Sequence, residues 1–243
     1  GQPDGLFFLA CPWTAANLAT LDGAFSFGAA NSDTDRRTSH IHYEDGSANM
    51  ALASWQKAKA LVTTGAGVTA DAEMDLDAKA NWPTDGFRTN WTDTPGNAYT
   101  PIGYLAWKGT MKVTIGAASV PTGAPNQSQT LTGAASSTAR GALFWSTMVA
   151  SSASIVTSAT GLGGIMVGGM DGTNEGAAAT SELDGDGTSQ TGNTFTQTKA
   201  QQHIISVTGG AAPTVKAACD SALWRADVGL SWTTTDGPVS REV

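Results

Sequence analysis

The chain has 243 residues, of which 40% are hydrophobic, 29 are glycine and only 14% are charged, and its formal net charge is −8. This apolar content excludes a disordered chain, and an acidic surface disfavours nucleic acid as a partner because it repels phosphates. No apolar run approaches the ~18 residues of a membrane-spanning helix, so we expect no membrane insertion.

Short apolar or alternating runs, separated by Gly, Asn, Asp and Pro clusters, predict an all-β chain. The runs form two series in the same order. The first series comprises GLFFLACPW (5–13), AFSFGAANSD (24–33), KALVTTGAG (59–67) and NWPTDGFRTNWTDT (81–94). The second comprises GALFWSTMV (141–149), GIMVGGMDGT (164–173), HIISVTGGA (203–211) and LWRADVGLSWTTTDG (223–237). This order indicates an internal duplication.

We therefore predict two tandem antiparallel β-sandwiches of jelly-roll type. Copy one spans 1–118, a linker or first strand of copy two spans 119–136, and copy two spans 137–243. Within the linker, QSQTLTG is a candidate strand. The YLAW run (104–107) predicts a last strand in copy one that has no counterpart in copy two. That missing strand could be disordered, removed or supplied by a neighbour.

One segment is ambiguous between helix and strand. ANMALASWQKAKALV (48–62) contains residues that favour helix, whereas its counterpart NTFTQTKAQQHIISV (193–207) favours strand. If the copies share a fold, both segments are strands.

Four acidic residues alternate with apolar residues across 70–82, namely Asp71, Glu73, Asp75 and Asp77. A helix would bring like charges together at i and i+4, whereas a strand places all four on one face, so we predict a strand. The acids could contribute to a cation site or a catalytic pair if loops added further ligands. The favoured interpretation is a solvated strand face, because the counterpart VKAACDSALW (215–224) lacks the row.

Two further segments contain possible metal ligands. Asp184 and Asp186 have the spacing of a calcium loop, but a hairpin turn is favoured because the flanking helices and the last glutamate of such a loop are missing. His40, His42 and Glu44 share one face of a predicted strand and could bind a transition metal. Histidines on a solvated strand are favoured, since copy two has no equivalent.

Catalytic motifs are missing from the sequence. It contains no GxSxG, HExxH or CxxC, and the Gly-rich run 161–169 lacks the Lys of a phosphate loop. The acid row could supply the two carboxylates of a glycoside hydrolase, but nothing singles out a pair. Cys11 and Cys219 are more consistent with two small buried thiols than with a long-range disulfide. We therefore predict no enzymatic activity, no catalytic residue and no cofactor.

Eight tryptophans are the remaining feature. Four recur by copy and are predicted to pack between sheets, namely Trp82, Trp91, Trp224 and Trp232. Trp13 and Trp55 have no match between copies. They are equally consistent with core packing and with stacking on a glycan or a partner protein.

The segments GQPDGLFFLA, FGAANSDTDRR, AEMDLDAKANWPTDGFRTNW and YLAWKG together resemble duplicated β-sandwich proteins of tailed-bacteriophage virions. The matching features are Gln2-Pro3, Asp85-Gly86-Phe87, Trp91 and Tyr104-Leu105-Ala106. Copy two departs from the pattern, with Ala139 in place of the proline and Val228-Gly229-Leu230 in place of the turn triplet. The resemblance implies a virion surface component, such as a head decoration, fibre or spike protein, and implies no active site.

The leading hypothesis is a non-enzymatic structural protein of the virion surface. It would assemble with copies of itself, as a trimer or a larger symmetric array, and would contact other virion proteins. The alternative is a lectin-like module that binds host glycans through Trp13 and Trp55, with Ca²⁺ held by Asp184 and Asp186 or by the acid row. A surface hydrolase is the third hypothesis.

Overall fold

The computed structural model describes residues 1–11, 23–43, 52–64, 70–93, 102–109, 113–116, 127–131, 141–147, 156–158, 164–171, 173–183, 190–199, 201–205, 214–224 and 228–234. Most of these residues form strands, which confirms the prediction of an all-β chain. The helical part of the described chain is one short 3₁₀ helix, η1 (Lys79–Asn81). Among the described residues there is no helix with the length and hydrophobicity needed to cross a membrane.

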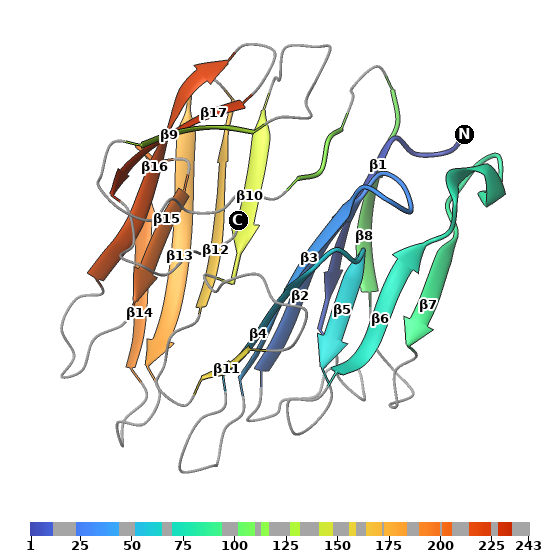
Figure 1. Ribbon diagram of the computed structural model, residues 1–243, viewed down its shortest axis with the longest axis horizontal. Coiled ribbons are helices and arrows are strands. Elements are labelled where there is room, and N and C mark those ends of the chain that lie inside the picture. The colour runs from blue at the N-terminus through green and yellow to red at the C-terminus, as the bar shows by residue number, and fades with distance from the viewer. Residues whose placement is uncertain are drawn as a thin grey trace. The chain divides into compact units, whose positions relative to one another are not determined.

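The chain divides into two compact units. Unit 1 contains residues 1–116 and 152–157, and unit 2 contains residues 117–151 and 158–243. Figure 1 labels the strands of both.

Unit 1 has two sheets. The larger has the order β11 (Val156–Ser158), β4 (Leu52–Lys57), β3 (Arg36–Tyr43), β2 (Gly23–Ala30), β1 (Gly5–Ala10) and β8 (Ile102–Trp107). The smaller has the order β5 (Leu61–Thr64), β6 (Ala70–Leu76) and β7 (Thr89–Asp93). From β4 to β8, and from β5 to β7, neighbouring strands pair antiparallel. The ambiguous segment 48–62 thus contains β4 and the start of β5, and the strand prediction is confirmed.

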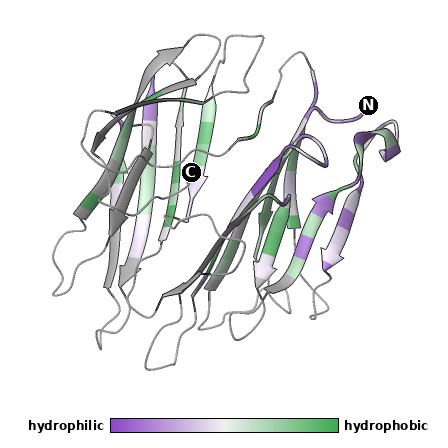
Figure 2. Ribbon diagram, viewed as in Figure 1, coloured by the Kyte–Doolittle hydropathy of each residue, from purple (hydrophilic) through white to green (hydrophobic). Residues whose placement is uncertain are grey.

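The two sheets of unit 1 share one hydrophobic core. Alternation along the strands turns every second side chain inward, and Figure 2 shows hydrophobic and hydrophilic residues alternating along β6. The buried cluster comprises Leu6, Phe8, Ala10 and Ala30 of the larger sheet, Ala60 just before β5, Leu61, Met74 and Leu76 of the smaller sheet, and Trp82.

Gly28 allows the two sheets to approach closely. A Cβ atom on Gly28 of β2 would lie 1.8 Å from the carbonyl oxygen of Ala60, just before β5. Any larger residue would collide with this backbone, so the glycine sets the separation of β2 and β5.

Unit 2 also has two sheets. One has the order β10 (Ala142–Ser146), β12 (Gly164–Met170), β13 (Glu175–Leu183) and β14 (Gln190–Thr196). The other has the order β15 (Gln201–Ile205), β16 (Thr214–Trp224), β17 (Val228–Thr234) and β9 (Gln127–Leu131). All neighbours in both sheets pair antiparallel. The candidate strand in the linker is β9, and the segment 193–207 contributes to β14 and β15.

Strand order can be compared between the units. In unit 1, β1 to β4 lie side by side in chain order, and so do β5 to β7. In unit 2, β10, β12, β13 and β14 lie side by side in chain order, and so do β15 to β17. The additional strands differ, because β8 borders β1 and β11 borders β4 in unit 1, whereas β9 borders β17 in unit 2.

Candidate functional site

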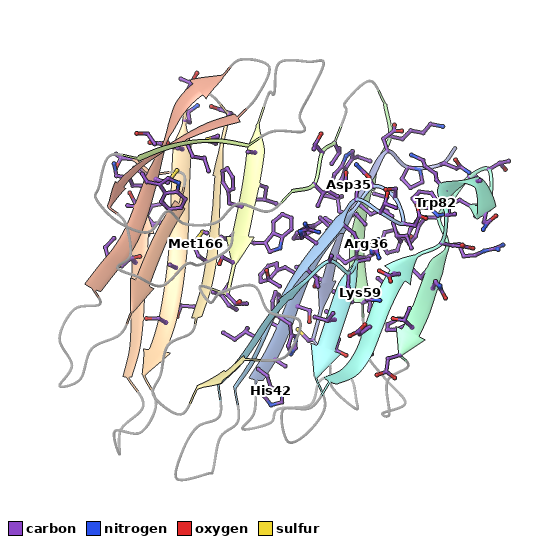
Figure 3. The ribbon with its side chains drawn as sticks, in the orientation of Figure 1. Asp35, Arg36, His42, Lys59, Trp82 and Met166 are labelled. Atoms are coloured by element: carbon purple, nitrogen blue, oxygen red, sulfur yellow. The ribbon has the colours of Figure 1, made fainter. Side chains whose placement is uncertain are left out.

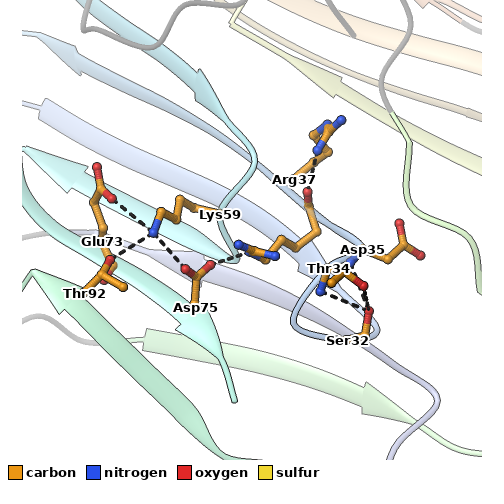
Figure 4. A network of polar contacts seen from close by, with 9 residues as sticks. Ser32, Thr34, Asp35, Arg37, Lys59, Glu73, Asp75 and Thr92 are labelled. Atoms are coloured by element: carbon orange, nitrogen blue, oxygen red, sulfur yellow. Dashed lines mark hydrogen bonds and ion pairs between the residues drawn. The ribbon is translucent and has the colours of Figure 1, made fainter. Parts of the chain in front are cut away.

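The acid row on β6 belongs to an ion network within unit 1 (Figure 4). Asp75 is only 7% exposed and accepts hydrogen bonds from Arg36 Nε at 2.5 Å and from Lys59 Nζ at 2.8 Å. The same Lys59 ammonium lies 3.3 Å from the Glu73 carboxylate and donates to Thr92 Oγ1 at 3.0 Å. The prediction of a solvated strand face is therefore wrong for Asp75 and for the largely buried Glu73.

The network balances its own charge. The guanidinium of Arg36 comes from the start of β3 and the ammonium of Lys59 from the residues before β5, and they face two carboxylates of β6. A metal ion bound to Asp75 would have to displace both cations. The described residues include no group of three His, Cys, Asp or Glu side chains that could hold a metal ion. The side chain of Asp71, the first acid of the row, lies outside the described part of the chain.

The last acid of the row, Asp77, organises the turn after β6. Its Oδ1 accepts hydrogen bonds from the Ala78 amide at 2.8 Å and from Asn81 Nδ2 at 3.1 Å. Chiefly the bond from Asn81, and then that from Ala78, lowers the pKa of this carboxyl. The Asp77 carbonyl accepts a hydrogen bond from Trp82 Nε1 at 2.7 Å, so this part of the row fixes the indole ring.

The tryptophans that recur between the two series pack as predicted wherever their side chains are described. Trp82 is 5% exposed, lies beside η1 (Figure 3) and stacks edge-on against Phe87. Trp91 packs partly buried against the core of unit 1, and Trp232 is fully buried in unit 2. The side chain of Trp224 lies outside the described residues.

Two histidines of β3 are buried rather than solvated, so that prediction is wrong. His40 is 0% exposed and His42 is nearly buried. Ser26 Oγ lies 2.6 Å from His40 Nδ1 and donates its single proton to the Val62 carbonyl at 2.5 Å. Nδ1 must therefore carry the proton that joins His40 to Ser26.

Burial also decides the charge of His40. Loss of hydration, with a smaller contribution from His42, lowers the pKa of His40 to about 3. The imidazole is therefore neutral at neutral pH. Its hydrogen bond to Ser26 links β3 to β2, and the bond from Ser26 to Val62 extends this link to β5. Glu44, the third residue of the predicted metal set, lies outside the described residues.

The other sequence candidates are only partly described. Trp13, Asp184 and Asp186 lie outside the described residues, and for Trp55 only the backbone pairing with His40 is described. Cys219 is a buried thiol, as predicted, whereas Cys11 is only partly buried, and both are free. Burial raises the pKa of the Cys11 thiol.

A surface feature that the sequence analysis missed is a set of exposed apolar side chains on edge strands. The large hydrophobic residues that are clearly exposed in the described part are Leu9, Tyr104, Leu105, Leu143 and Phe195. All except Leu9 lie on β8, β10 or β14, which are edge strands of the two sheets that contain them. Their sequence patterns resemble those of inner strands, and only the sheet order shows them to be edges.

No protein-family model, no curated protein and no solved structure matches this chain.

Proposed function

We propose that the chain is a non-enzymatic structural protein that assembles with copies of itself at the surface of a virion. The observation that carries this proposal is the location of exposed apolar side chains on the edge strands β8, β10 and β14. An edge strand presents unpaired backbone N–H and C=O groups, and an apolar, uncovered edge is a template for pairing with another chain. Edges of this kind suit a protein whose role is assembly.

The polar residues best suited to catalysis or metal binding make internal contacts in unit 1. Asp75 joins Arg36 and Lys59, and His40 joins Ser26. These contacts connect β6 to the start of β3 and β3 to β2. A scaffold role accounts for them without a substrate.

We further propose that the units are duplicated β-sandwiches. In both units, four strands lie side by side in chain order, namely β1 to β4 in unit 1 and β10, β12, β13 and β14 in unit 2. A three-strand meander follows in each unit, and this shared order supports the interpretation. The resemblance of copy one to virion β-sandwich proteins supports the virion surface as the location, with head decoration, fibre and spike as the candidate structures.

The proposal is tested by the mass of the purified chain in solution. Multi-angle light scattering coupled to size exclusion, over micromolar to submillimolar concentrations, should give a discrete oligomer or a growing assembly. A monomer at every concentration would contradict self-assembly. Antibodies raised against the chain should label the surface of intact particles, and labelling confined to disrupted particles would contradict the surface location.

A further inference from the structure

The β10–β14 sheet of unit 2 has two uncharged edge strands, each with one exposed large apolar side chain. β10 (ALFWS) and β14 (QTGNTFT) are its end strands, and neither contains a charged residue. Leu143 on β10 is 54% exposed and Phe195 on β14 is 70% exposed. Among the described strands, none pairs with the outer edge of β10 or of β14.

The corresponding edges of unit 1 are covered. β1, which holds the place of β10 in the strand order, pairs along its whole length with β8. β4, which holds the place of β14, is bordered by β11. The same kind of sheet thus takes an added strand at both ends in unit 1, which indicates that the two edges in unit 2 can each accept one.

The two edges of unit 2 are complementary in direction. Two strands, β12 and β13, lie between them and every neighbouring pair is antiparallel, so β10 and β14 run in opposite directions. A second molecule placed beside the first in the same orientation brings its β14 next to β10 as an antiparallel pair.

The exposed side chains of both edges also lie on one face of the sheet. Residues directly opposite each other in neighbouring strands share a face, and the register runs from Trp145 to Val167, to Ala178 and to Phe195. Leu143 is two residues from Trp145 and shares its face. Pairing of β10 with β14 would therefore place Leu143 and Phe195 of two molecules on the same side, where they can contact each other.

We propose that β10 of one molecule pairs antiparallel with β14 of a second copy of this chain. The inference rests on the proposed self-assembly and specifies its interface. One such contact covers one edge of each kind, whereas pairing of β10 with another β10 leaves β14 open. Because each molecule offers one edge of each kind, the contact is head-to-tail and produces a closed ring or an open filament.

Two edge variants and a matched control test the interface. Leu143→Lys and Phe195→Lys each place a charge on one exposed edge, whereas Ala178→Lys places the same charge on the same face but on the inner strand β13, where residue 178 is also exposed. We expect each edge variant to weaken assembly by roughly tenfold or more and to be monomeric by light scattering. The Ala178→Lys variant should keep the wild-type mass.

Mixing the two edge variants gives the sharpest result. The Leu143→Lys molecule retains its β14 edge and the Phe195→Lys molecule retains its β10 edge, so an equimolar mixture should form a heterodimer that cannot grow. Hydrogen exchange should show the β10 amides of Phe195→Lys protected in the mixture and exposed in Phe195→Lys alone. Lys substitution at these exposed sites leaves the core of unit 2 intact.

The outcomes separate this interface from self-assembly in general. Oligomers that survive both edge variants would overturn the β10–β14 pairing but not the proposed function. A Phe195→Lys dimer beside a Leu143→Lys monomer would overturn it in favour of β10 pairing with itself. Equal disruption by Ala178→Lys would indicate contact through the face rather than the edge and would also overturn it. A wild-type monomer at all concentrations contradicts the proposed function itself.

Discussion

Replacing His40 by Asn should remove a specific acid sensitivity of folding. His40 is fully buried, and its Nδ1–H contacts Ser26 Oγ at 2.6 Å. The amide nitrogen of Asn branches from the same carbon position as Nδ1, so His40→Asn keeps a donor toward Ser26 but removes the titrating ring. The variant therefore separates the charge of residue 40 from its hydrogen bond.

The size of the effect follows from the shift in pKa. The pKa of His40 falls from 6.5 to about 3 on folding because burial opposes the charged ring. Below pH 6.5 the unfolded chain binds a proton that the folded chain does not, so the free energy of unfolding falls as the pH falls, until about pH 3. At pH 5, about 1.5 units below the unfolded pKa, the loss is about 2 kcal/mol.

Urea unfolding at pH 7 and pH 5, followed by tryptophan fluorescence, measures this difference. The wild type should lose about 2 kcal/mol more between the two pH values than His40→Asn does. The smaller Asn side chain lowers stability at both pH values alike, so only the difference between the two profiles is read. Parallel profiles for the two proteins would refute the assignment of a buried neutral imidazole to residue 40.

Other substitutions in unit 1 test its internal contacts by urea or thermal unfolding. Asp75→Asn should cost about 2 kcal/mol because it leaves two largely buried cations without their shared carboxylate, whereas Arg88→Gln, at an exposed pair, should cost under ~1 kcal/mol; equal costs would contradict the network. Gly28→Ala should cost about 1–3 kcal/mol because its methyl group meets the backbone before β5, and an unchanged Tm would show that the sheets can separate freely. Trp82→Phe should cost about 2 kcal/mol through the lost indole hydrogen bond and volume, and a smaller cost than that of Arg88→Gln would contradict its core role.

Local pattern was sufficient to predict the strands. In β6 the alternation of apolar and acidic residues gives the strand and its inward face, and the buried Met74 and Leu76 confirm both. Tryptophans that recur at equivalent places in the two series predicted core positions for Trp82 and Trp232. The alternation lies within a few residues, and the recurrence needs only a comparison of two stretches of sequence, so no knowledge of the fold is needed to interpret either signal.

Local sequence pattern could not predict contacts between residues that are far apart in the chain. Asp75 was expected to face water because alternation places it opposite the core, but Arg36, which lies 39 positions earlier, reaches it from β3. His40 was expected on a solvated face for the same reason, and its burial depends on β5 lying over β2 and β3. Alternation distinguishes two faces of a strand, but it does not show what covers the second face.

Charge distinguishes the edges that are protected from those available for assembly. β7, an edge of the smaller sheet in unit 1, ends at the exposed Asp93 and follows the exposed Arg88, and charges at an edge disfavour pairing with another chain. β10 and β14 carry no such charge, and their exposed residues are Leu143 and Phe195. A protein selected only to remain monomeric would be expected to protect these edges as well, so their lack of charge and their exposed apolar side chains favour pairing through the β10–β14 sheet of unit 2.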